Sequence, residues 1–163
     1  MHKNKLIIGN IDHMNTKIML SLLLLLTCPF IHAKAPDLVG TWKTIDDRTG
    51  YSLSDVVISK DKNNQYSAKI VSTRSVPGTA AQDTCIKCAG AQKNMPVIGM
   101  TMLSGLSADP AHQHEYTGGK MLDLNSGQHS AARARLMNSG KHLLIHSRAD
   151  GAAVGRNLTW VKY

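Results

Sequence analysis

Two cysteines three residues apart, Cys85 and Cys88, form the motif with the most specific chemistry in this sequence. A pair at this spacing can close a disulfide, supply two thiolates to a zinc site, or act as a redox pair in thiol exchange. A zinc ribbon needs a second ligand pair, and no second pair is present. A redox pair needs its first cysteine at the N-terminus of a helix, where the helix dipole lowers the pKa of the thiol. The flanking segments 83–84 and 89–90 do not have the pattern of a helix start. The motif therefore favours a loop-stapling disulfide, with a metal site second and a thiol oxidoreductase third.

Histidines are a second group with the chemistry to bind metal. Neutral imidazoles suit zinc or copper, so a site of three is conceivable. The alternative is that these side chains face water, because the loop and strand positions they occupy are polar. We expect solvated histidines and no metal site; the residues concerned are His112, His114, His129, His142 and His146.

The neighbouring carboxylates Asp46 and Asp47 suggest acid/base catalysis, which requires one carboxyl with a raised pKa in a dry pocket. Adjacent residues in a turn ending at Thr49 and Gly50 do not provide such a pocket, and Asp commonly caps turns. The sequence also lacks a serine nucleophile elbow, a phosphate-binding glycine loop and a zinc-protease histidine pair. We therefore expect a protein that is not an enzyme and holds no cofactor.

The N-terminal segment has the pattern of a secretory leader. Lys17 precedes an apolar run at 18–26, and the segment Ile31-His32-Ala33 ends in a small residue suited to a cleavage site. We expect cleavage after Ala33, which gives a signal peptide at 1–33 and a single mature domain at 34–163, with Met14 as an alternative start. The apolar run is short for a bilayer span, so no integral membrane segment is expected after cleavage. The predicted location is periplasmic or secreted.

Net charge gives a weak signal for a nucleic-acid partner. The mature domain would hold 130 of the 163 residues, with 16 of the 19 basic and 10 of the 11 acidic side chains. These basic residues are scattered and the chain is poor in aromatic side chains. We therefore expect a solvated surface and no nucleic-acid partner.

The mature domain has the two-residue period of strands and carries no long amphipathic helical stripe. Compact turns of Asn, Ser and Gly separate several of the strands, as in hairpins. An all-β fold follows: a small antiparallel up-and-down barrel of seven or eight strands, whose closure hides the sheet edges. The expected strands are 40–44, 54–60, 65–73, 96–103 (strand or short helix), 120–124, 128–137, 141–147 and 157–163, with a loop at 105–113.

Five short motifs stand out along the mature domain: V-G-T-W-K-T-I-D-D-R-T-G at 39–50, the Cys-x-x-Cys loop, P-V-I-G at 96–99, G-G-K-M-L-D at 118–123 and G-R-N-L-T-W at 155–160. Together they resemble the DUF2147 family, exported bacterial proteins of unassigned function. The resemblance spans about residues 38–163 and implies a class of protein without supplying catalytic residues. The sequence departs from the family where Tyr116-Thr-Gly118 replaces an aromatic-Gly pair and where segment 124–127 replaces a turn containing proline.

The two ends of the domain also resemble the calycin, or lipocalin-like, pattern. In that pattern a Gly-x-Trp on the first strand places an indole at the barrel floor, and a basic residue of the last strand stacks on it. Gly40 and Trp42 supply the first part, and Arg156 or Lys162 supplies the second. We assign barrel closure to Gly40, Trp42, Arg156 and Trp160.

The inward faces of the predicted strands carry small and apolar side chains, which either fill the barrel or leave a cavity for an apolar guest. The first hypothesis is a barrel that binds a small apolar or amphiphilic ligand. The alternative is an envelope structural or interaction protein with a filled barrel. The candidate cavity residues are Tyr66, Ala68, Ala132, Ala134, Leu143 and Ile145, with Met95, Met100, Met102 and Met121 as candidates for its mouth.

Overall fold

The computed structural model describes residues 37–137 and 140–163, so the predicted leader at 1–33 lies outside the described residues. A three-residue 3-10 helix, η1 (Gly90–Gln92), occurs within these ranges. No helix among the described residues is long and apolar enough to cross a membrane. The strands are β1 (Gly40–Ile45), β2 (Ser52–Lys60), β3 (Tyr66–Thr73), β4 (Thr101–Ala108), β5 (Glu115–Asp123), β6 (Gln128–Met137), β7 (His142–Arg148) and β8 (Arg156–Lys162).

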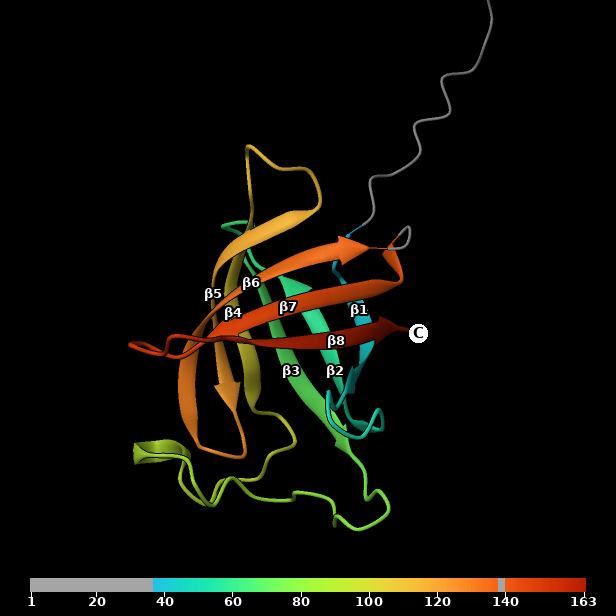
Figure 1. Cartoon of the computed structure of the whole chain (residues 1–163), viewed down its shortest axis with the longest axis vertical. Coiled ribbons are helices and arrows are strands. Elements are labelled where there is room, and N and C mark those ends of the chain that lie inside the picture. Colours follow the sequence, from blue (N-terminus) through green and yellow to red (C-terminus); the bar gives the residue numbers. More distant parts are fainter. Residues whose placement is uncertain (1–36, 138–139) are drawn as a thin grey trace, which may run out of the picture. The chain divides into compact units, whose positions relative to one another are not determined.

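These strands form one closed antiparallel barrel in which each strand pairs with the next and β8 pairs with β1 (Figure 1). The prediction of an all-β up-and-down barrel is confirmed, with eight strands. Closure leaves neither β1 nor β8 with an unpaired row of backbone N–H and C=O groups. In the β1–β8 pair, Trp42 lies opposite Lys162 and Thr44 opposite Trp160.

Alternation along the strands separates the core from the solvent. In β6, Ala132, Ala134 and Leu136 are buried, whereas Arg133 and Arg135 between them are exposed. This is the period expected when successive side chains point to opposite faces of a sheet. The sequence of β6 therefore fixes which of its faces turns inward.

Strands β4 and β5 differ from their predicted bounds. The prediction ended the fourth strand at 103 and placed a loop from 105, but β4 runs from Thr101 to Ala108. Gly105 lies inside the strand with a positive φ of 75°, and its backbone closely approaches Gly118 of β5, which also has a positive φ. Glycine occurs both in turns and at irregular positions inside strands, and the sequence pattern alone does not distinguish the two.

The connections divide into two sets at opposite ends of the barrel. The β2–β3, β4–β5 and β6–β7 connections lie at what we call the closed end. The β1–β2, β3–β4, β5–β6 and β7–β8 connections lie at what we call the mouth. In Figure 1 the long β3–β4 connection extends beyond the strand ends at the mouth.

The closed end is filled by side chains. Trp42 has no exposed surface, and its indole N–H donates a hydrogen bond to the carbonyl of Leu38 at 2.8 Å. The Lys162 ammonium lies 5.2 Å from the centre of the Trp42 ring and donates to the carbonyl of Asp37 at 2.8 Å. A Cβ on Gly40 would stand 3.0 Å from the Lys162 stem, so the motif glycine makes room for this contact.

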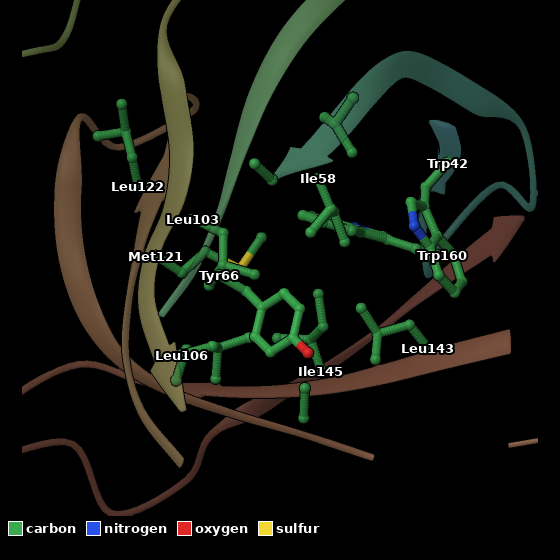
Figure 2. Close-up of a cluster of buried hydrophobic side chains, with 14 of the residues drawn as sticks. Trp42, Ile58, Tyr66, Leu103, Leu106, Met121, Leu122, Leu143, Ile145 and Trp160 are labelled. Atoms are coloured by element: carbon green, nitrogen blue, oxygen red, sulfur yellow. The ribbon is translucent and has the colours of Figure 1, made fainter. Parts of the chain in front are cut away.

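Two tyrosines extend the packing at the closed end. The rings of Tyr66 and Tyr116 meet edge to face with centroids 5.5 Å apart. Burial, together with a hydrogen bond to Asp37, raises the pKa of the Tyr66 hydroxyl above its ordinary value. Figure 2 shows Tyr66 among Leu106, Leu143 and Ile145 in the barrel interior. At this end of the barrel the interior is filled by side chains that pack against one another.

Replacing Trp42 tests the role of the closed end. Trp42→Ala removes the largest buried side chain there, and we expect the free energy of unfolding to fall by about 3–5 kcal/mol. Urea unfolding followed by far-UV circular dichroism measures this loss. The matched control is Thr41→Ala, next along β1 on the other face of the strand, with an expected loss of at most about 1 kcal/mol. Equal losses in the two variants would contradict the assignment.

Candidate ligand-binding site

A cavity of about 290 Å³ opens at the mouth of the barrel. Its walls include residues from all four mouth connections and from the strand ends beside them. Trp160 of β8 is 1% exposed and stands opposite Thr44 of β1, so its indole forms part of the inner wall. The apolar part of the lining comprises Ile45, Leu53, Met102, Met121, Leu122, Leu124, Val154, Leu158 and Trp160.

Paired hydroxyl groups form one part of the polar lining of the cavity, which also includes the side chains of Gln82, Asn125, Gln128 and His129. Thr44 and Ser54 pair through their side-chain oxygens at 2.8 Å, and Ser130 pairs with Ser147 across β6 and β7. Each hydroxyl offers one donor and two acceptor lone pairs, so a paired hydroxyl retains capacity to accept a further hydrogen bond. These groups can therefore meet a ligand hydroxyl or N–H without leaving a buried charge uncompensated.

The charged rim of the cavity is internally neutralised on the β8 side. The Arg156 guanidinium donates to the Asp47 carboxylate at 2.8 Å and lies 3.8 Å from that of Asp123. The hydrogen bond from Arg156 lowers the pKa of Asp47, and the same bond raises the pKa of Arg156. This cation is thus held between two acids.

A second arginine on the rim is held by a partly buried network. Arg74 follows β3 and forms an ion pair with Asp55 of β2. The same carboxylate accepts hydrogen bonds from the hydroxyls of Ser72 at 2.8 Å and Tyr163 at 2.9 Å. Burial raises the pKa of Asp55, but the hydrogen bonds from Arg74, Ser72 and Tyr163 outweigh it, so the pKa lies below its ordinary value. The network joins the C-terminal residue to β2 and β3.

The segment 84–98 of the β3–β4 connection, which we call the disulfide loop, flanks the mouth. Cys85 and Cys88 form a disulfide, as the sequence analysis favoured, and both are buried. The backbone N–H of Cys85 donates to the carbonyl of Met95 at 2.9 Å, which ties the two arms of the loop together. A Cβ on Gly127 would stand 1.9 Å from the Lys87 carbonyl oxygen, so the loop rests directly on the β5–β6 turn.

The disulfide loop also covers the outer face of the β5–β6 hairpin. The side-chain oxygen of Gln92 lies 3.4 Å from a ring nitrogen of His129, which is paired in register with Leu122. Leu122 has no exposed surface, and Figure 2 shows it pointing away from the cluster around Tyr66. The loop thus contacts the hairpin at His129, whose partner in register is a buried leucine that also lines the cavity.

The six candidate cavity residues lie elsewhere in the barrel. All are buried within the hydrophobic core, and none lines the cavity at the mouth. Of the four candidate methionines, Met102 and Met121 line that cavity, Met100 is buried, and Met95 is exposed on the disulfide loop. The six core residues are Tyr66, Ala68, Ala132, Ala134, Leu143 and Ile145.

The residues assigned to barrel closure separate between the two ends. Gly40 and Trp42 lie at the closed end, whereas Trp160 lines the cavity and Arg156 lies on its rim. Of the two basic candidates, Lys162 takes the place over the Trp42 ring. Arg156 is the first residue of β8, at the mouth, and Lys162 is its last residue, at the closed end, so the length of this strand lies between them.

The polar candidates from the sequence have local partners. Asp46 accepts hydrogen bonds from the backbone N–H and hydroxyl of Thr49, as a turn cap does. His146 lies 2.9 Å from the side chain of Asn157. Within residues 37–137 and 140–163, no three His, Cys, Asp or Glu side chains gather in a group suited to holding a metal ion.

The candidate cavity residues left out the hydroxyls of Ser130 and Ser147. The sequence pattern places Ser130 on the inward face of its strand with Ala132 and Ala134, one step nearer the mouth, but it was not assigned to the cavity. Extending the two-residue period by one step beyond Ile145 would also have found Ser147. The change from apolar to hydroxyl side chains at inward positions is the usable signal.

The fold has a counterpart among solved structures. The chain is similar to HP1028 from the human pathogen Helicobacter pylori, a protein described as belonging to the lipocalin family. The TM-score is 0.62 with 23% sequence identity, over 78% of this chain and 83% of that one. The likeness establishes a lipocalin-like barrel as the class of fold.

The family follows from the sequence comparison. The model of the DUF2147 family, described as an uncharacterized protein conserved in bacteria, matches residues 40–162. The chain belongs to this family, which confirms the resemblance seen in its motifs. No curated protein matches the chain.

Removing the negative charge of Asp55 should lower the free energy of unfolding and also change how that free energy depends on pH. Because folding lowers the pKa of Asp55, its contribution is fully present well above the ordinary value of 3.8 and is lost as pH falls through and below it. We expect Asp55→Asn to lower the free energy of unfolding at neutral pH by about 1–3 kcal/mol, with a smaller difference from wild type in acid. Urea unfolding across pH measures both effects.

The control for this variant is Asp150→Asn, in the exposed β7–β8 connection, with an expected change below about 0.5 kcal/mol. A constant difference between Asp55→Asn and wild type from neutral to acid pH would show that charge is not the cause.

Removing the disulfide tests how the loop is held. The double variant Cys85→Ala with Cys88→Ala loses a cross-link closing a very short ring, so we expect a stability loss of about 2 kcal/mol. Exchange of the main-chain amides at positions 85 and 97, which are hydrogen-bonded to the carbonyls of Met95 and Asp83, should accelerate, whereas exchange in β7 should not. Hydrogen exchange read by mass spectrometry measures this. Unchanged exchange at both loop amides would contradict a stapling role.

Proposed function

We propose that this protein binds a small, mainly apolar molecule that carries an uncharged polar group, in the cavity at the barrel mouth. The observation that supports this is the composition of the cavity wall. Trp160, Leu158 and Met121 share a space of about 290 Å³ with paired hydroxyls. Ligand pockets usually combine an apolar lining with a few polar groups that fix orientation, and this volume is near their lower bound.

The charges at the rim support an uncharged ligand group over an ionic one. Arg156 lies between Asp47 and Asp123, and Arg74 is paired with Asp55. A ligand carboxylate would have to compete with these aspartates for the two guanidinium groups. A ligand hydroxyl or amide would meet Ser130, Ser147 or Thr44 without that competition.

Binding without chemistry is our proposal for this cavity. A hydrolytic or acid/base reaction would need a titratable group set into the apolar part of the wall. Thr44, which stands opposite Trp160, is paired with Ser54, and Ser130 is paired with Ser147, an arrangement suited to orienting a ligand. The leader pattern at 1–33 supports the further proposal that the domain acts outside the cytoplasm.

A fluorescent probe tests ligand binding. The neutral dye N-phenylnaphthylamine should bind the purified protein saturably at one site, with emission enhanced by the apolar wall. Ser130→Leu fills the cavity beside Ser147 and should weaken binding at least about tenfold, since the added side chain occupies the space of the ligand. Fluorescence titration gives both affinities, and thermal melting checks that each variant is folded.

The matched control is Ala131→Leu, the adjacent and exposed position of β6, which should bind the dye as wild type does. No saturable binding by the folded wild-type protein would favour the alternative, a barrel that acts through its surface. Equal affinities for the two leucine variants would place any dye site outside this cavity.

A further inference from the structure

The connections at the two ends of the barrel expose different kinds of side chain. At the closed end, segments 61–65 and 109–114 are polar and expose no large apolar residue. The connections at the mouth expose five such residues. Val39, Met137 and Tyr163 are also exposed beside strand ends at the closed end, but they lie on three separate segments, whereas three of the five residues at the mouth lie in one loop. An exposed apolar patch of this kind marks a surface that meets an apolar environment. The five residues are Tyr51, Ile86, Met95, Ile98 and Val154.

The disulfide loop contributes most of this apolar surface. Ile86 is 69% exposed, Met95 51% and Ile98 57%. Ile86 follows the buried Cys85 and Ile98 follows the buried Val97, so each exposed isoleucine is held beside an anchored residue. The disulfide and the main-chain bond between Cys85 and Met95 tie these anchors together. The loop is thus a structured element that presents its larger apolar side chains outward.

Positive charge accompanies the apolar side chains. Lys87 and Lys93 are exposed within the disulfide loop, which contains no Asp or Glu. Across residues 37–137 and 140–163, neither lysine takes part in an ion pair. The nearest acid in sequence, Asp83, stands outside the loop. Asp47, Asp55 and Asp123 on the rim are held by arginines, whereas Asp83 and Asp150 in the mouth connections are exposed and form no ion pair among the described residues. The loop itself is an apolar surface with uncompensated positive charge.

We propose that the disulfide loop docks the barrel mouth on an anionic lipid surface. Its exposed apolar side chains would enter the boundary between head groups and acyl chains, while Lys87 and Lys93 contact lipid phosphates. A protein interface of ordinary size takes about 20–30 residues a side, more than this 15-residue loop provides. Lipid binding requires only apolar area and positive charge, which the loop has. This proposal goes beyond ligand binding and does not require an occupied cavity.

A tryptophan placed in the loop reports contact with lipid. The native Trp42 and Trp160 are 0% and 1% exposed, so a quencher confined to the bilayer acts selectively on an added surface tryptophan. In Ile98→Trp, vesicles of phosphatidylcholine and phosphatidylglycerol with brominated acyl chains should quench the new emission. Vesicles of brominated phosphatidylcholine alone should quench it much less. The matched control is Val71→Trp, an exposed position on β3, which should not be quenched.

Lysine variants test the electrostatic part. Adding Lys87→Gln and Lys93→Gln to Ile98→Trp should weaken the vesicle affinity about fivefold per lysine, or about 25-fold together. Adding Lys62→Gln and Lys69→Gln removes the same charge from exposed positions elsewhere, and should change the affinity less than about twofold. Only Lys87 and Lys93 lie in the disulfide loop.

Three results would overturn the docking proposal. They are equal quenching at positions 98 and 71, no quenching at position 98, and equal effects of the two lysine pairs. N-phenylnaphthylamine binding measured on the same samples separates the two proposals. Intact dye binding without vesicle contact leaves the cavity function standing, whereas vesicle contact without dye binding leaves docking standing.

Discussion

The contact between the Trp42 indole and Lys162 is the interaction on which the closed end depends. It exists because β1 and β8 pair in a register that places these residues opposite each other. The indole N–H is satisfied by the Leu38 carbonyl and the ammonium by that of Asp37, so both polar groups are buried with partners. The chain ahead of the first strand is thereby held against the end of the last one. The closed end is thus packed with side chains, and the cavity opens at the mouth.

The interior changes character along the strands. From the closed end toward the mouth, the inward positions of β6 read Leu136, Ala134, Ala132 and Ser130. The neighbouring strand β7 shows the same change, from Leu143 through Ile145 to Ser147. Large apolar side chains thus fill one end, and shorter hydroxyls leave space at the other. The cavity thus coincides with a change of side-chain size and polarity along β6 and β7.

The sequence predicted the barrel better than the site. Alternation was sufficient for β6, where small apolar and charged residues exchange at every step. It was insufficient at 96–103, where a continuous apolar run has no period, and at Gly105, where a strand irregularity has the composition of a turn. The candidate cavity residues were chosen as apolar inward positions, which are the positions that pack tightly. Which basic residue stacks on Trp42 depends on where β8 ends, and a sequence pattern places strand ends poorly.

The pairing of the first and last strands also affects the order in which the barrel folds. Thr44 and Trp160 are neighbours in the sheet although more than one hundred residues separate them in the chain. Contacts of such high sequence separation form late, because the entropy of closing a long loop must be overcome first. The hairpins from β2 to β7 can assemble locally, but the ring stays incomplete until the final seven-residue strand arrives. While β8 is still on the ribosome, the rest of the domain is therefore an unfinished sheet in which β1 pairs with β2 alone.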